Sequence, residues 1–172
     1  MTMRLSNCNI STLTIFLYLV TCFFTSTTKG DYKSEFMSPQ NAVRRATRAG
    51  LSPLVWDSKL ENYALQYANT RRGDCALQHS GGPYGENIFW GSGDGSGWPP
   101  AYASSDWASE VKYYHYYNNS CDRGHECGHY TQIVWRETKR IGCARVVCFN
   151  NKGVFMICNY DPPGNYIGEK PY

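Results

Sequence analysis

Of the eight cysteines in this chain, six lie downstream of an apolar N-terminal run, and this arrangement limits the possible folds more than any other feature. The apolar run begins near Leu13, follows one early positive charge at Arg4, and gives way to small residues up to Gly30. This order is typical of a secretory signal peptide, whose apolar core is too short to span a bilayer comfortably. We therefore expect residues 1–30 to be removed and residues 31–172 to form one domain in an oxidising compartment.

Removing the signal peptide also changes the charge of the chain. Without Arg4 and Lys29 the 17 basic residues fall to 15, against 14 acidic ones, so the formal net charge falls from +3 to +1. A mixed-charge surface of this kind gives no reason to expect a nucleic-acid partner. No later segment is apolar enough to cross a membrane, so we expect no stable membrane insertion. We expect the protein to be a monomer.

The C-terminal half suggests how two of the cysteines pair. Residues 141–149 and 153–160 have the pattern of two strands joined by a tight turn. With the turn centred on residues 150–151, Cys143 lies opposite Cys158. Facing residues on antiparallel strands are close enough for a disulfide, so we predict that these two cysteines are bonded.

The other four cysteines follow from spacing and from the strand pattern. Cys121 and Cys127 enclose a short loop rich in glycine and charge, which a disulfide can close. Cys148 lies an odd number of residues from Cys143 and points to the other face of the sheet, so it is left for Cys75. We thus predict three disulfides, each worth about 2–4 kcal/mol.

Helical patterns come first along the chain and strand patterns come last. We predict helices from Ser38-Pro39 to Gly50, after Asp57, and from Ser104 or Ser105, followed by strands at 129–135, 140–149 and 153–160. Helices followed by strands favour an α+β layered domain.

A glycine-rich stretch, residues 81–100, is flanked by aromatic side chains. It lacks the Gly-Lys-Ser/Thr of a phosphate-binding loop, so we interpret it as a connector. Trp90, Trp98 and Tyr102 are candidates to line a site for a flat apolar ligand such as a sterol. The alternative is ordinary core and loop packing.

Two histidines and two glutamates from four separate segments are the candidate ligands for a metal: His79, Glu86, Glu110 and His129. Imidazole nitrogen and carboxylate oxygen both suit zinc or another divalent ion. The alternative is a hydrogen-bond network that joins helices to the sheet. The chain has no G-x-S-x-G elbow and no H-E-x-x-H motif, so we expect no required cofactor and do not favour an enzyme.

Asn118 begins an Asn-Asn-Ser sequon, which makes it a candidate glycosylation site on a surface turn.

Two motifs resemble those of a known family. Residues 128–135 read Gly-His-Tyr-Thr-Gln-Ile-Val-Trp and residues 158–166 read Cys-Asn-Tyr-Asp-Pro-Pro-Gly-Asn-Tyr, and both resemble the CAP superfamily of cysteine-rich secretory proteins and venom allergens. Within it, residues 38–41 and 79–87 look like the plant class-one pathogenesis-related proteins. The resemblance implies a CAP-type α-β-α sandwich over residues 31–172, with the disulfides predicted above. It also implies that the two histidines and two glutamates form a cleft that binds zinc or another divalent ion in some relatives.

The resemblance further implies a role in defence. Its members are linked to antimicrobial action and sterol binding, so we hypothesise a secreted protein of the apoplast, with the vacuole as an alternative, that sequesters sterols or other lipids, including microbial ones. The alternatives are a metal-dependent hydrolase and a precursor that releases residues 162–172 by cleavage between Asp161 and Pro162. The charged loop 123–126 departs from the family pattern, and we expect it to offer a second ion site or to alter the cleft rim.

Overall fold

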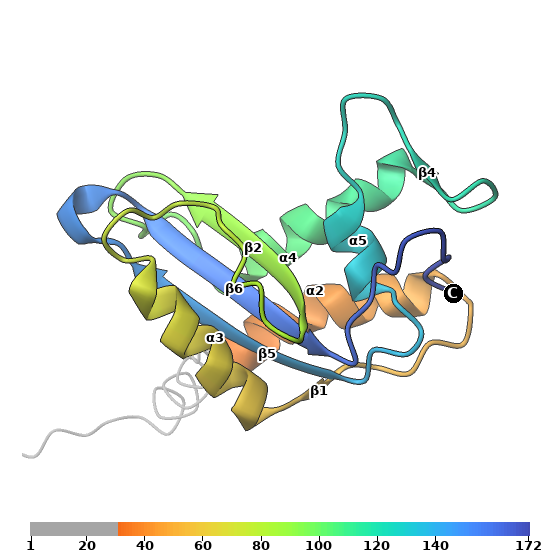
Figure 1. Ribbon diagram of the computed structural model, residues 1–172, viewed down its shortest axis with the longest axis horizontal. Helices are drawn as coiled ribbons and strands as arrows, with labels where there is room; N and C mark the ends of the chain where they lie inside the picture. Colours follow the sequence, from red (N-terminus) through yellow and green to blue (C-terminus); the bar gives the residue numbers. More distant parts are fainter. Residues whose placement is uncertain (1–30) are drawn as a thin grey trace, which may run out of the picture. The chain divides into compact units, whose positions relative to one another are not determined.

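A four-stranded mixed sheet lies at the centre of the computed structural model, which describes residues 31–172 (Figure 1). The expected signal peptide, residues 1–30, lies outside the described residues. The strands are β1 (Val55–Trp56), β2 (Gly85–Gly91), β5 (Arg140–Val147) and β6 (Val154–Asp161), in the order β1-β5-β6-β2. Strand β1 is parallel to β5, and the other pairs are antiparallel.

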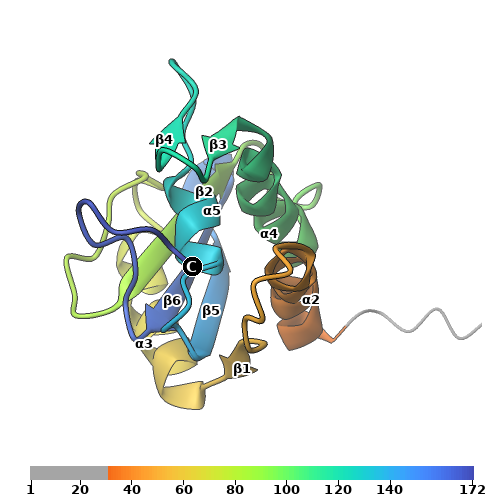
Figure 2. The ribbon, with the colours of Figure 1, turned by 90° about the vertical axis from the view of Figure 1, so that its right-hand side faces the viewer.

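Helices cover both faces of this sheet, as Figure 2 shows in side view. Helix α3 (Ser58–Thr70) lies on one face, and helices α2 (Tyr32–Ala46) and α4 (Pro100–Ser109) lie on the other. Short elements complete the fold: η1 (Glu110–Tyr113), β3 (Tyr114–His115), β4 (Ser120–Cys121), α5 (Gly128–Ile133) and η2 (Phe149–Asn151). The predicted α+β sandwich is confirmed.

The alternation of side chains along β6 divides the core between the two faces. Phe155 packs in one cluster with Ala64 and Ala68 of α3. Met156 points the other way and joins a second cluster that contains Trp107 of α4. Because both faces of β6 are covered, seven of its eight residues, all except the last, are buried and the strand has no polar side.

The predicted hairpin has the expected register. Cys143 of β5 is paired with Cys158 of β6, and their Cα atoms are 4.0 Å apart. The other two disulfides are Cys75–Cys148 and Cys121–Cys127, with Cα–Cα distances of 5.9 Å in each case. The structure therefore contains the three pairs that we expected from the sequence.

Helix α2 begins earlier than we predicted, and that prediction was wrong. We expected Pro39 at its first turn, but the helix starts at Tyr32 and Pro39 lies inside it. A proline inside a helix costs about 3 kcal/mol. The added turns bury Phe36 completely against the sheet, which offsets this cost. The helix ends at Ala46, before Arg48 takes a left-handed backbone conformation, and not at Gly50.

Helix α4 also begins before the expected cap at Ser104 or Ser105. It starts at Pro100, whose fixed φ angle suits the first position of a helix. Ser104 is buried in the helix, and its hydroxyl donates to the carbonyl oxygen of Phe36 at 2.9 Å. The serine therefore joins α4 to α2 instead of capping α4.

The prediction of a strand at residues 129–135 is wrong, because helix α5 occupies most of this segment. Tyr130, Ile133 and Val134 are all buried, which is the spacing of one helical face. A short apolar run of this kind fits a strand or a buried helix equally well by periodicity alone. The segment packs against α4 and β2, and this packing selects the helical conformation.

Among residues 31–172, no helix combines the length and the apolar character that a membrane span requires.

Candidate functional site

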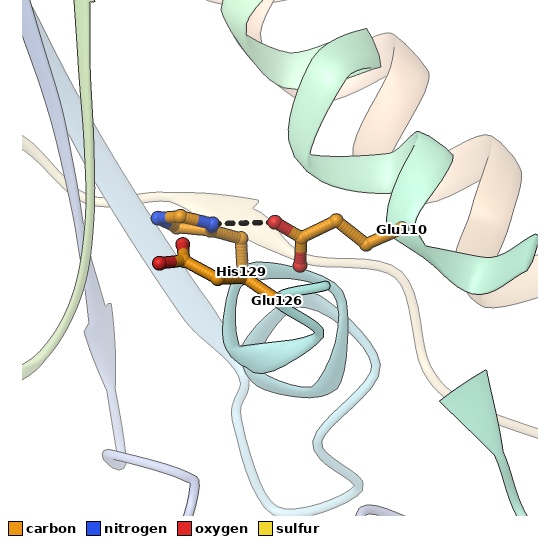
Figure 3. Close-up of side chains that lie close together, drawn as sticks. All are labelled: Glu110, Glu126 and His129. Atoms are coloured by element: carbon orange, nitrogen blue, oxygen red, sulfur yellow. Dashed lines mark hydrogen bonds and ion pairs between the residues drawn. The ribbon is translucent and has the colours of Figure 1, made fainter. Parts of the chain in front are cut away.

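His129 and Glu110 form a closely held pair where helix α5 meets the end of α4. His129 Nδ1 lies 2.6 Å from Glu110 Oε1 (Figure 3). The other carboxylate oxygen, Oε2, accepts the backbone N–H of Tyr130 at 3.0 Å. The imidazole also stacks on the ring of Trp107, with centroids 6.0 Å apart. The ring is thus held by its Nδ1 side, and Nε2 is the nitrogen left for a ligand.

His79 and Glu86 repeat this arrangement with a loop histidine and a strand glutamate. His79 Nδ1 lies 2.8 Å from Glu86 Oε1, which also accepts the backbone N–H of Ser80 at 2.9 Å. Glu86 Oε2 accepts from the amide of Asn159 at 3.1 Å and from the hydroxyl of Ser80. Glu86 therefore has protein donors on both oxygens, and its carboxylate holds the His79 ring in place.

These hydrogen bonds change how the second pair titrates. The hydrogen bond to Glu86 raises the pKa of His79, and burial of the ring only partly opposes this. Burial works to raise the pKa of Glu86, but hydrogen bonds from His79, Ser80 and Asn159 outweigh it, so the pKa is lowered. Both shifts favour an ion pair between imidazolium and carboxylate.

The two pairs converge on one cavity beside strand β2. The cavity has a volume of about 310 Å³ and is lined by His79, Glu86, Asn87, Glu126, Cys127, Gly128, His129 and Asn165. Glu110 is not among the lining residues, because it lies behind the ring of His129. The structure therefore brings three of the four candidates to the cavity wall, with the fourth supporting His129.

Glu126 is a cleft residue that the sequence indicated only as part of the charged loop 123–126. It is exposed, directly precedes Cys127, and lies three residues before His129. Ligand atoms of Glu110, Glu126 and His129 lie within 4.8 Å of one another (Figure 3). The sequence position of Glu126 could have indicated its place in the cleft, because the Cys121–Cys127 disulfide fixes the end of the loop next to His129. Two carboxylates, Glu86 and Glu126, line the cleft, and Glu110 lies against His129, so the cleft is attractive to a cation.

The three aromatic candidates do not lie together. Trp98 and Tyr102 make an edge contact at 4.7 Å between centroids, and both rings pack near Phe89. Trp90 is the next residue along β2, so its side chain points to the opposite face of the sheet. It lines a separate hollow of about 440 Å³ with Asp74, Cys75, Leu77 and Lys152.

The expected cleavage junction is part of the folded structure. Asp161 is the last residue of β6 and forms an ion pair with Arg140. The carbonyl oxygen of Pro162 accepts from the hydroxyl of Thr138 at 2.9 Å. Further along, the ring of Tyr172 stacks on that of Tyr116 at 4.6 Å. The tail after Asp161 is thus docked on the domain.

The candidate glycosylation site lies at the surface. Asn118 is exposed in the turn between β3 and β4, and its side-chain oxygen accepts from the hydroxyl of Ser120 at 2.8 Å.

Comparison with known proteins gives consistent matches. The model of the cysteine-rich secretory protein family, CAP, matches residues 37–160. The chain is 62% identical over 141 residues to pathogenesis-related protein PR-1 of Medicago truncatula, covering 82% of this chain and 79% of that protein. It is 46% identical over 160 residues to pathogenesis-related protein 1 of Arabidopsis thaliana, covering 93% and 94%. Among solved structures, NaASP2 with Zn²⁺ superposes with a TM-score of 0.65 at 25% identity, over 86% of this chain and 88% of that one.

Proposed function

Because the chain belongs to the cysteine-rich secretory protein family, CAP, and within it to the plant pathogenesis-related PR-1 proteins, we propose that it is an extracellular defence protein that binds sterols or other lipids. Proteins of this family are secreted, and three disulfides suit an oxidising compartment. In this proposal the protein acts in the apoplast, with the vacuole as the alternative, and limits microbial growth by withdrawing sterol from microbial membranes.

The observation that carries the proposal is the hollow beside Trp90. Its volume of about 440 Å³ lies within the range of sites for small organic ligands. Leu77 and the indole of Trp90 give it apolar walls. The indole N–H already donates to the carbonyl oxygen of Lys152 at 2.8 Å, so an apolar ligand against the ring leaves no donor unpaired.

The test is equilibrium binding of a fluorescent sterol to the oxidised protein in solution. We expect saturable binding that is weakened at least tenfold by Trp90→Ala. Tyr117→Ala is the matched control, because Tyr117 is an exposed aromatic residue outside the hollow. Trp98→Ala is unsuitable, since its ring packs on Phe89 and against Gly91. If correctly folded protein binds no sterol, the lipid proposal is wrong.

A second candidate function is supported by the His/Glu cleft, where we propose a site for a divalent cation. Ligand atoms of Glu110, Glu126 and His129 lie within 4.8 Å of one another, which fits such an ion, and His79, whose Nδ1 is also bonded to a carboxylate, lines the same cavity. Carboxylates that orient histidine ligands in this way are usual around zinc. Zinc would supply a Lewis acid and lower the pKa of a bound water. The related NaASP2 has been crystallised with Zn²⁺.

Calorimetric titration with zinc chloride tests this second candidate. We expect one site per chain and a loss of at least tenfold in affinity for His129→Ala. His115→Ala is the control, since His115 is an exposed histidine paired with Asp122 away from the cleft. Equal affinities in the two variants would exclude the cleft. A metal-dependent hydrolase would in addition lose its activity on chelation and in His129→Ala.

The signalling-peptide alternative requires the docked tail to open. Pro171 is buried and its carbonyl oxygen accepts the backbone N–H of Arg136 at 2.7 Å, so release of residues 162–172 needs local unfolding as well as cleavage. Mass spectrometry of extracellular fluid after immune challenge tests this alternative. A C-terminus that is always intact would count against it.

A further inference from the structure

One end of the sheet carries an exposed surface in which apolar side chains lie beside cations. It is formed by the turn between β5 and β6 and by the loop after α3, together with Trp90 of β2, and we call it the hairpin-tip surface. Its apolar members are Leu77, Trp90 and Phe149, each between 44% and 58% exposed. Its cationic members are Arg72 and Lys152. In Figure 1 the turn between β5 and β6 lies at the opposite end of the sheet from the C-terminus.

The hairpin-tip surface is continuous, because its two segments are bonded to each other. The Cys75–Cys148 disulfide joins the loop to the end of β5. The backbone N–H of Phe149 donates to the carbonyl oxygen of Arg72 at 2.8 Å. Lys152 Nζ donates to the carbonyl oxygen of Gly73 at 2.9 Å. A covalent bond and two cross-segment hydrogen bonds make this surface a fixed feature of the fold.

Polar groups next to the apolar side chains have partners inside the protein. The indole N–H of Trp90 is bonded to the carbonyl oxygen of Lys152, as described above. Arg72 Nε donates to the carbonyl oxygen of Val147 at 3.0 Å, and its guanidinium lies 4.5 Å from the centroid of the Phe149 ring. The apolar side chains can therefore leave water without stranding these donors.

Charge is concentrated at this end of the molecule. The two segments that form the surface, 71–78 and 147–153, carry Arg71, Arg72, Lys152 and Asp74. These three cations and one acid give a local net charge of +2, whereas residues 31–172 as a whole carry only +1. Asp74 is bonded to Arg71, so its charge is compensated locally.

We propose that the hairpin-tip surface docks the protein on an anionic lipid bilayer. Apolar and aromatic side chains beside cations are the combination that binds at the boundary between headgroups and acyl chains. Leu77 and Trp90 also line the hollow that we assigned to a lipid, so docking places the opening of the hollow against the bilayer. The biological role of docking rests on the proposed lipid function, but docking itself requires no sterol.

Co-sedimentation of the oxidised protein with sterol-free vesicles tests the proposal. We expect binding to phosphatidylcholine vesicles that contain phosphatidylserine, and much weaker binding to phosphatidylcholine alone or at high salt. Phe149→Ala removes an exposed ring and should weaken binding about tenfold. Lys152→Gln removes one charge near the headgroups and should weaken it about fivefold.

Tyr117→Ala is the control variant. Tyr117 is an almost fully exposed aromatic residue in the turn between β3 and β4, away from the hairpin-tip surface, so vesicle binding should not change. Phe149 is also exposed, so both variants should fold normally. The proposal is overturned if wild-type protein fails to bind the anionic vesicles, or if Phe149→Ala binds as well as Tyr117→Ala.

The same preparations separate this inference from the proposed function. If sterol binds in solution but vesicles do not bind, docking is wrong and the lipid function stands. If vesicles bind but no sterol binds in solution, docking stands and the lipid function is wrong. Capture of a protein partner by the same surface, without vesicle binding, would also reject the bilayer as its occupant.

Discussion

The two His–Glu pairs of the cleft have the same chemistry but are supported in opposite ways. In the pair on α5, the side chains of His129 and Glu110 are 23% and 14% exposed. In the pair beside β2, Glu86 is 6% exposed whereas His79 is 60% exposed. The core therefore places the first imidazole directly, but it places only the carboxylate of the second. The cleft has one rigid wall and one wall that can adjust to a ligand.

The supports behind the two pairs differ accordingly. The buried side chain of Arg44 donates to the carbonyl oxygen of Ile133 at the end of helix α5, and the ring of Trp107 stacks on the His129 imidazole of the same helix. His79 lies at the end of the loop that follows α3, and the Cys75–Cys148 disulfide ties this loop to the sheet. If this difference in support is real, variants that weaken the two supports should differ in stability and in metal affinity.

A Cys75→Ala, Cys148→Ala variant lacks the Cys75–Cys148 disulfide. Its free energy of unfolding should be lower by about 4 kcal/mol, because this disulfide closes a long loop. Its cysteines are 73 residues apart, whereas Cys121 and Cys127 are 6 apart. The corresponding Cys121→Ala, Cys127→Ala variant should therefore lose only about 2 kcal/mol. Urea unfolding measures both, and equal losses would contradict the prediction.

Arg44→Met should remove the support beneath α5 and cost about 3 kcal/mol, because it leaves buried carbonyl oxygens without a donor. Arg44 Nη1 donates at 2.8 Å to the carbonyl oxygens of both Ile133 and Trp135. Burial, with a smaller effect of Arg136, lowers the pKa of Arg44 to about 10, so it is charged at neutral pH. Thermal unfolding measures the loss. The neighbouring Arg45→Met is the exposed control and should change stability by less than about 0.5 kcal/mol.

Zinc affinity should respond to the glutamates of both pairs but more strongly to Glu110. Carboxylates behind histidine ligands are worth about 10–100-fold in metal affinity. We expect Glu110→Gln near the upper end, since His129 has little room to reorient, and Glu86→Gln near the lower end, since His79 is exposed and free to readjust. Calorimetric titration measures both variants. A larger loss for Glu86→Gln would reverse our assignment of the rigid wall.

The smallest effect concerns the pH dependence of stability at His79. Its pKa is raised by Glu86, so the folded protein holds the proton more tightly than the unfolded chain. This stabilisation is fully present below the ordinary histidine pKa of about 6.5 and is lost as the pH rises through the folded value. His79→Gln should thus cost more at low pH than at high pH, by less than about 1 kcal/mol, because the exposed ring is screened. Urea unfolding of the wild-type protein and of His79→Gln, at a pH below and a pH above this range, measures the difference. A cost that does not change with pH would contradict the prediction.

Local patterns in the sequence were enough for the hairpin and the disulfides. Alternation along β5 and β6 and the turn at residues 150–151 place Cys143 opposite Cys158, and the remaining pairs follow from spacing. The fold class and the four candidate His and Glu residues were also available, and the resemblance to the CAP family implied that the four form one cleft. Strand register depends on the alternation of residues along each strand, and disulfide pairing depends on the spacing between cysteines. The sequence shows both directly.

Other features depended on contacts between distant segments. The segment at residues 129–135 is helical because packing resolves an apolar run that periodicity leaves ambiguous, and Pro39 lies inside α2 because Phe36 is buried. Glu126 lies beside His129 at the end of a loop that the Cys121–Cys127 disulfide closes. Trp90 is separated from Trp98 and Tyr102 because its side chain lies on the other face of the sheet. The sequence alone thus determined which residues are available for chemistry and how adjacent strands pair. The tertiary structure decided which of them meet, because side-chain convergence is set by the packing of whole elements and not by local propensity.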